Sequence, residues 1–170
     1  MNIGAFHKDI THIVAMSGYP SVERMLKTVF RGLLSGYAPA VFRAEVEEFG
    51  GYAYANAAFS LTTTDAKVML VHSKDDNTSD FRMFEELRAL LGKRDNITFL
   101  ELDGKRHNPT YTDDAVMYKD EFFARLTEAR KKKQLDTPEA RAEFAKKFDF
   151  DRMTVQDEAV WERIFEHLEN

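Results

Sequence analysis

Three short runs of apolar and β-branched residues stand out along the chain and predict buried strands. They cover residues Ile10 to Met16, Lys67 to Val71 and Ile97 to Leu102, and each is bounded by polar or turn-forming residues. Amphipathic segments with helical periodicity separate the runs. Strand–helix–strand order predicts parallel pairing through right-handed crossovers, so the fold class is α/β, with a small, mostly parallel sheet flanked by helices.

Apolar residues three and four positions apart predict helices between and after the strands. Residues able to cap a helix start precede these segments, and glycine follows two of them. The predicted starts are Ser21, Ser79 or Asp80, Asp113 or Asp114, Thr137 and Thr154, and the predicted stops are Gly36 and Gly92. We expect a single domain over residues 1–170, with a helical insertion at 20–65 and a helical C-terminal region at 112–170.

Composition and charge narrow the class of function. The 170 residues are 44% hydrophobic and carry a formal charge of −5, with acidic and basic residues interspersed, which argues against nucleic-acid or membrane partners. The chain has no cysteine, so disulfides and thiolate chemistry are excluded. No apolar run is long enough to span a bilayer and no signal pattern opens the sequence, so we expect a cytoplasmic protein. The expected partner is a small-molecule or peptide substrate.

Polar residues with catalytic potential follow the second and third predicted strands. Asp76 lies in the loop after one strand and His107 in the loop after the next. The carboxyl ends of parallel strands meet at one edge of a sheet, where ligands bind, so we expect the two side chains to lie close together. An acid beside an imidazole is the pairing that a hydrolase uses to orient its general base.

Two motifs carry a resemblance to the α/β-hydrolases of the serine hydrolase superfamily. The run from His72 to Asp76, His-Ser-Lys-Asp-Asp, resembles the His-Gly-x-x-Asp segment of the triad acid, and Gly104 to Pro109, Gly-Lys-Arg-His-Asn-Pro, resembles the Gly-x-Gly-His-x-Pro loop of the triad histidine. The helix-rich C-terminal region is similar to that of bacterial prolyl oligopeptidase-like and acyl esterase-like enzymes. The resemblance implies that Asp76 and His107 are catalytic, and it implies no cofactor and no metal.

The nucleophile elbow of that family, Gly-x-Ser-x-Gly, has no counterpart in this sequence. The nearest run, Ala15 to Tyr19, has alanine and tyrosine where the glycines should be, so Ser17 is either a turn-capping residue or a nucleophile. Residues Met1 to Phe6 resemble the end of the helix that follows the nucleophile. We therefore expect a C-terminal portion of such an enzyme, inactive by itself, and an in-frame Gly-x-Ser-x-Gly sequence upstream of the Met1 codon.

Structural interpretations stand beside the catalytic ones. Asp76 could be a turn or helix-cap acid, although Asp75 is the better candidate to cap the following helix. His107 could be an ordinary loop histidine. A third possibility is a metal site that combines these residues with His72. The other histidines form no constellation in the sequence and are expected on the surface or on helix faces; they are His7, His12 and His167.

The aromatic segment from Phe42 to Phe59 lies where the resembled family inserts a substrate-covering lid, which would favour an apolar or acyl substrate. Alternatively, its rings pack the segment onto the sheet. The leading hypothesis is a serine-hydrolase-type protein for ester, thioester or peptide bonds; the rival is a non-catalytic interaction or scaffold domain. Without the preceding strands of the family, Ile10 to Met16 would form an exposed sheet edge, so we also expect self-association or a partner there.

Overall fold

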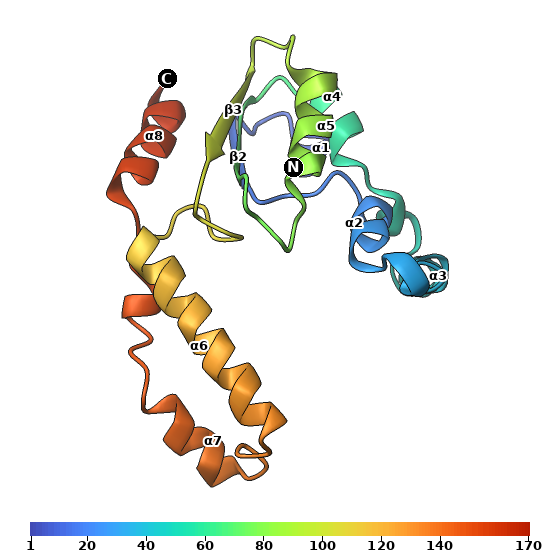
Figure 1. The fold of residues 1–170 in the computed structure, drawn as a ribbon. Coiled ribbons are helices and arrows are strands. Elements are labelled where there is room, and N and C mark those ends of the chain that lie inside the picture. The colour runs from blue at the N-terminus through green and yellow to red at the C-terminus, as the bar shows by residue number, and fades with distance from the viewer. The chain divides into compact units, whose positions relative to one another are not determined.

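The computed structural model describes residues 1–170, which form two compact units (Figure 1). The first unit comprises residues 1–109 together with 162–170, and the second comprises residues 110–161. The sheet, its covering helices and both predicted catalytic residues belong to the first unit.

The sheet has three parallel strands in the order β1-β2-β3, which confirms an α/β fold with a small parallel sheet. The strands are β1 (His12–Met16), β2 (Lys67–Ser73) and β3 (Ile97–Leu102), close to the predicted ranges. Val14 is opposite Met69 in the β1–β2 register, and Val71 is opposite Leu100 in the β2–β3 register. β2 is buried along nearly its whole length because it is the central strand.

Five α-helices and two 3₁₀ turns complete most of the first unit. They are α1 (Ile3–Phe6), α2 (Val22–Val29), η1 (Gly32–Leu34), α3 (Tyr37–Phe49), η2 (Gly50–Tyr54), α4 (Ala57–Thr63) and α5 (Phe81–Leu91). Ser21 caps α2 and Asp80 caps α5 through their side chains, as predicted. The predicted stop at Gly36 is wrong: α2 ends at Val29, because the next residue, Phe30, leaves the helical conformation with a ψ of 89°, and Gly36 instead precedes α3.

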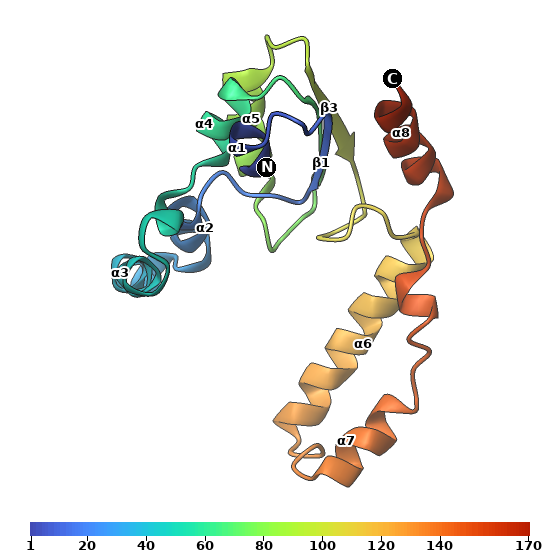
Figure 2. The ribbon, with the colours of Figure 1, turned by 180° about the vertical axis from the view of Figure 1, so that it is seen from behind.

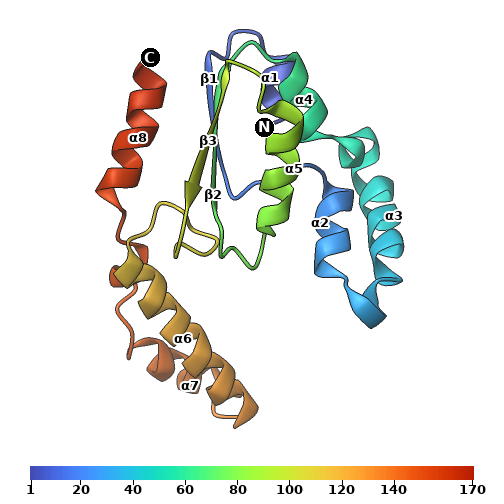
Figure 3. The same ribbon diagram turned by 45° about the horizontal axis from the view of Figure 1, so that its top comes forward.

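The two faces of the sheet are covered by different helices. Ile13, Val68 and Leu70 pack with apolar side chains of α4 and α5 to form the core. In Figures 2 and 3, α1, α4 and α5 lie on this side of the strands, and the C-terminal helix α8 (Glu158–Glu169) lies on the other. Ile164 of α8 is buried, so its helix contributes a second apolar layer.

The second unit is helical, with α6 (Asp113–Lys131), α7 (Pro138–Ala145), the 3₁₀ turn η3 (Arg152–Thr154) and the first residues of α8. Thr112 and Thr137 cap α6 and α7 through their hydroxyls. The predicted start of the last helix at Thr154 is wrong, because Thr154 lies in η3. Asp157 accepts the N–H groups of Ala159 and Val160 instead, and α8 begins at Glu158.

No helix in the structure combines the length and the apolar character required to cross a membrane.

Candidate active site

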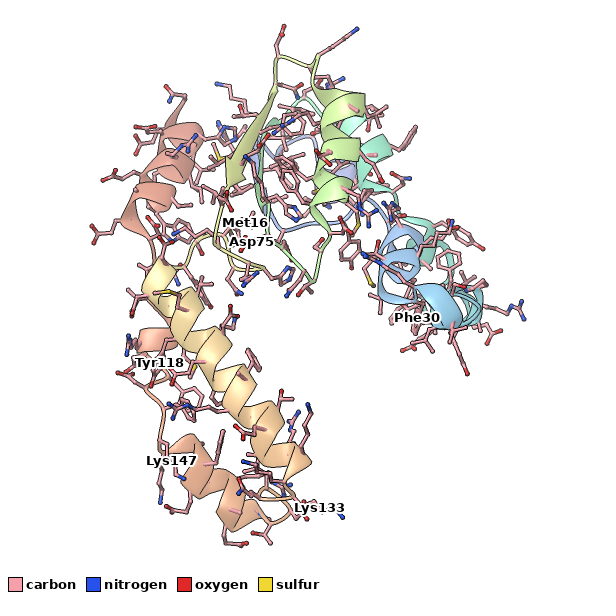
Figure 4. All side chains as sticks on the ribbon, in the orientation of Figure 1. Met16, Phe30, Asp75, Tyr118, Lys133 and Lys147 are labelled. Atoms are coloured by element: carbon pink, nitrogen blue, oxygen red, sulfur yellow. The ribbon has the colours of Figure 1, made fainter.

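Asp76 and His107 meet at the carboxyl edge of the sheet. Asp76 lies in the loop that follows β2, and His107 lies in the loop that follows β3, its parallel neighbour. Nδ1 of His107 is 2.9 Å from Oδ2 of Asp76. The three strands are parallel, so their carboxyl ends lie at this one edge; Figure 4 labels Asp75, in the loop after β2, and Met16, the last residue of β1.

The two carboxylate oxygens of Asp76 have different tasks. Oδ1 accepts the backbone N–H of Thr78 at 2.8 Å and that of Ser79 at 2.9 Å, which folds the chain into a turn before α5. Oδ2 accepts the imidazole of His107. The side chain of Asp76 is 0% exposed. The turn interpretation and the acid–imidazole interpretation are thus both compatible with the geometry, each on its own oxygen.

His72, the last residue but one of β2, joins this network. Its ring is 1% exposed, and its Nε2 lies 2.7 Å from the carbonyl oxygen of Ser79 and 3.2 Å from Oδ2 of Asp76. A carbonyl oxygen can only accept, so this Nε2 carries a hydrogen. The ring packs against Phe81 and Phe84. Sequence reasoning did not foresee this supporting role, although the four-residue separation of His72 and Asp76 was visible.

Burial alone would raise the pKa of Asp76. Hydrogen bonds from His72 and His107, and from the backbone N–H groups of Ser79 and Thr78, outweigh burial and lower the pKa to about 2. The carboxylate is therefore ionised throughout the neutral range. A permanently charged acceptor favours the tautomer of His107 that carries its hydrogen on Nδ1.

The loop that carries His107 is fixed to the loop after β2. Gly104 adopts a φ of 73° and Arg106 a φ of 51°, so the backbone turns sharply after β3. The backbone N–H of Arg106 donates to Oδ1 of Asp75 at 3.1 Å, and the hydroxyl of Ser73 donates to the same oxygen. The expectation that Asp75 caps α5 is therefore wrong, since Asp75 bridges the two loops and Asp80 is the cap.

The side chain of His107 is 42% exposed, in contrast to its buried partner. The hydrogen bond to Asp76 uses Nδ1, which leaves Nε2 as the nitrogen that can take a proton from a reactant. An oriented general base at an accessible loop would need this arrangement of a buried carboxylate and an exposed imidazole.

Ser17, at the end of β1, has an unusual environment. Its φ is 48°, in the left-handed region that a non-glycine residue rarely adopts, and the residue is 6% exposed. Its hydroxyl is buried and has no hydrogen-bond partner. The turn-capping interpretation of Ser17 is wrong because that hydroxyl bonds to no backbone group. The next residue, Gly18, accepts the Ser79 hydroxyl at 3.3 Å, which links this turn to the loop of Asp76.

The metal interpretation of this edge is wrong, because no three histidine, aspartate or glutamate side chains are grouped as a metal ion would need, and Nε2 of His72 is directed at the carbonyl oxygen of Ser79. The expectation that the aromatic rings of residues 42–59 pack onto the sheet is wrong for several rings: Phe49, Tyr52, Tyr54 and Phe59 are exposed. Phe49, Tyr52 and Tyr54 instead line a hollow of about 820 Å³ together with Ile3 and Phe6.

Comparisons with known proteins identified no relative of this chain. No family model, no curated protein and no solved structure matches this chain.

Proposed function

We propose that the chain provides the acid and the general base of a serine-hydrolase-type site that cleaves ester, thioester or peptide bonds. His107 is the base, and Asp76 orients its ring. The observation that carries the proposal is the 2.9 Å contact between Nδ1 of the exposed His107 and the buried, ionised Asp76 at the carboxyl edge of a parallel sheet. The sequence motifs around both residues support the same assignment.

In the proposed reaction, Nε2 of His107 takes the proton of a hydroxyl nucleophile as its oxygen attacks the carbonyl carbon of the substrate. The imidazolium forms next to the Asp76 carboxylate, which stabilises its charge without itself taking up the proton. His107 then returns the proton to the leaving group as the bond between the carbonyl carbon and that group breaks. The network of His72 and Ser79 keeps Asp76 in place during both transfers.

The nucleophile is not assigned to a residue of this sequence, which lacks a Gly-x-Ser-x-Gly run. Ser17 has the backbone strain of a sharp strand-to-helix turn, but its hydroxyl is buried. We expect a fluorophosphonate probe to leave this chain unlabelled. Covalent labelling of Ser17 would instead place a complete set of catalytic groups within residues 1–170.

The base itself can be tested with an activated ester, p-nitrophenyl acetate, which an oriented imidazole hydrolyses without a serine. The His107→Gln variant is expected to reduce the rate above buffer by at least about tenfold, because the general base is lost. His7→Gln is the matched control, since His7 is also an exposed histidine. Equal rates for the wild-type chain and for His107→Gln would overturn the proposal.

A second proposal, a non-catalytic interaction domain, is favoured by one observation. Phe6 and Tyr52, which line the same hollow, are each more than two-thirds exposed, and contiguous exposed apolar surface commonly marks a binding face. This proposal predicts that binding of a protein partner is weakened by Tyr52→Ser and unchanged by His107→Gln. Dependence of an enzymatic reaction on His107 would count against it.

A further inference from the structure

A small hollow opens between helices α6 and α7 of the second unit, which lie side by side in Figures 1 and 2. Its volume is about 260 Å³, close to the lower limit of the roughly 300–1,000 Å³ that is usual for ligand pockets. Apolar side chains form one part of its lining: Phe122, Leu126 and Phe144. Charged side chains form the other: Arg130, Arg141 and Asp136. The lining therefore suits a small molecule with an apolar part and a charged part.

The two arginines lie on the facing sides of the helices. Phe122, Leu126 and Arg130 follow one another at four-residue intervals and so share one face of α6. Arg141 and Phe144 are three residues apart and share one face of α7. These two faces meet, because the rings of Phe122 and Phe144 are in contact, with their centroids 6.1 Å apart. The guanidinium groups therefore occupy sides where helix packing favours apolar residues, as is typical of functional positions.

Both guanidinium groups lack an ion-pair partner within the chain. Neither Arg130 nor Arg141 forms an ion pair with a carboxylate. Nη1 of Arg141 makes only a long hydrogen bond, 3.4 Å, to the carbonyl oxygen of Leu135. The nearby Lys132 differs, since it pairs with Glu128 at 2.6 Å. Two cations on one hollow repel each other, and an anion bound beside both would remove that repulsion.

The charge of the lining selects the charge of the ligand. Asp136 lies on the same hollow as the two arginines, so the lining carries a formal charge of +1. One negative charge on the ligand balances it, whereas a dianion such as a phosphate monoester would be repelled by the Asp136 carboxylate. The planar fork of a guanidinium matches a carboxylate, which can accept two N–H groups at once. The apolar side chains match a hydrocarbon tail, whose burial is favourable.

We infer that the hollow between α6 and α7 binds a small monocarboxylate with a short apolar tail. Arg130 and Arg141 hold the carboxylate, and the tail packs against the three apolar side chains of the lining. The whole lining lies within residues 110–161, apart from the Asp76–His107 site of the first unit, so the inference does not depend on the proposed hydrolase function. A ligand that binds only the folded unit also stabilises it.

Titration of the full ¹⁵N-labelled chain with sodium hexanoate, followed by ¹H–¹⁵N correlation spectra, tests the inference. We expect saturable shifts of amides in residues 122–145 with a dissociation constant on the order of 1 mM, as suits a ligand of so few atoms. Acetate has the charge without the tail, and 1-hexanol has the tail without the charge. Each should bind at least about tenfold more weakly than hexanoate. Hexanol that binds as tightly as hexanoate, or hexanoate shifts confined to other residues, would overturn the inference.

Variants of the charged lining make the test specific. Arg130→Gln and Arg141→Gln should each weaken hexanoate binding at least about fivefold, because each removes one charge-assisted contact. Lys132→Gln, which removes a lysine already paired with Glu128, is the control and should bind hexanoate like the wild-type chain. Asp136→Asn should tighten binding about twofold or more, because it removes the negative charge of the lining, and a folding defect could not produce that gain. Unchanged affinity in both arginine variants, or no gain of affinity in Asp136→Asn, would overturn the inference.

Discussion

Oδ2 of Asp76 accepts a hydrogen bond from Nδ1 of His107, which lies in an accessible loop. Oδ1 of the same carboxylate accepts hydrogen bonds from two backbone N–H groups of a turn. One buried side chain therefore links the local structure before α5 to the orientation of the imidazole. Any change to this carboxylate should affect stability and imidazole chemistry together.

Asp76→Asn should destabilise the first unit at neutral pH by roughly 1–2 kcal/mol, because a neutral amide cannot replace the hydrogen bonds that the buried carboxylate accepts. The pKa of Asp76 is lowered from 3.8 to about 2, so its stabilising contribution is present above pH 4 and is lost as pH falls from about 4 to 2. Urea unfolding at pH 7 and pH 2 measures both values.

The difference between the wild-type chain and Asp76→Asn should shrink strongly at the lower pH. Asp9→Asn is the control, because Asp9 is 88% exposed. A difference of the same size at both pH values would contradict the linkage to ionisation of Asp76.

Much of this fold could be predicted because its signals are local. The strands are short apolar runs, and the helix starts at Ser21, Asp80 and Thr137 depend on a side-chain oxygen two or three residues from the N–H that it accepts. The Asp76–His107 contact was also predictable, since adjacent parallel strands deliver their following loops to one edge.

Other features depend on packing between distant segments and had no local signal. The contact of His12 with His167 exists only because α8 returns to the sheet. The φ of Ser17 reflects its place between the β1 and β2 loops, and apolar character alone could not show that Tyr52 would be exposed. The early start predicted for α8 failed because two helix-capping residues, Thr154 and Asp157, compete three positions apart.

Docking of the C-terminal part of α8 should weaken as pH falls. Burial lowers the pKa of His167. A hydrogen bond with the backbone of Lys67 partly offsets this shift, and the charges of His12 and Lys67 lower the pKa further. The folded state therefore binds this proton less readily than the unfolded state, so stability is full above pH 6.5 and declines as pH drops below it. Hydrogen exchange of α8 amides at pH 7.5 and pH 5.5, corrected for intrinsic rates, should show lower protection at pH 5.5. His167→Gln should remove most of that difference; an unchanged difference would assign it to other groups.

The second unit should depend on Phe122. Its ring contacts those of Phe144, Phe148 and Phe150 from the facing segment, and it is the common neighbour of all three. Phe122→Ala should cost about 2–3 kcal/mol, less than for a fully buried phenylalanine, because the ring is only half-buried. Hydrogen exchange should then show lost protection in α6 and α7 and unchanged protection in α5. Phe123→Ala, at a half-exposed neighbouring ring, is the control and should have a smaller effect.

Self-association is expected at the free edge of β1. β1 pairs only with β2, and Ser17 N–H donates to Val71 while Thr11 accepts Lys67 N–H. In a parallel pair, alternate residues use their backbone groups on one neighbour, so the N–H and C=O of Val14 are directed at the open side. An apolar strand with free backbone groups can recruit a second chain.

Light scattering over a dilution series should therefore show concentration-dependent assembly. Val14→Pro removes one outward N–H without breaking a bond to β2 and should reduce assembly, whereas Val14→Thr keeps that N–H and should assemble like the wild-type chain. A folded monomer at every concentration, or equal assembly of the proline and threonine variants, would show that β1 is not the contact.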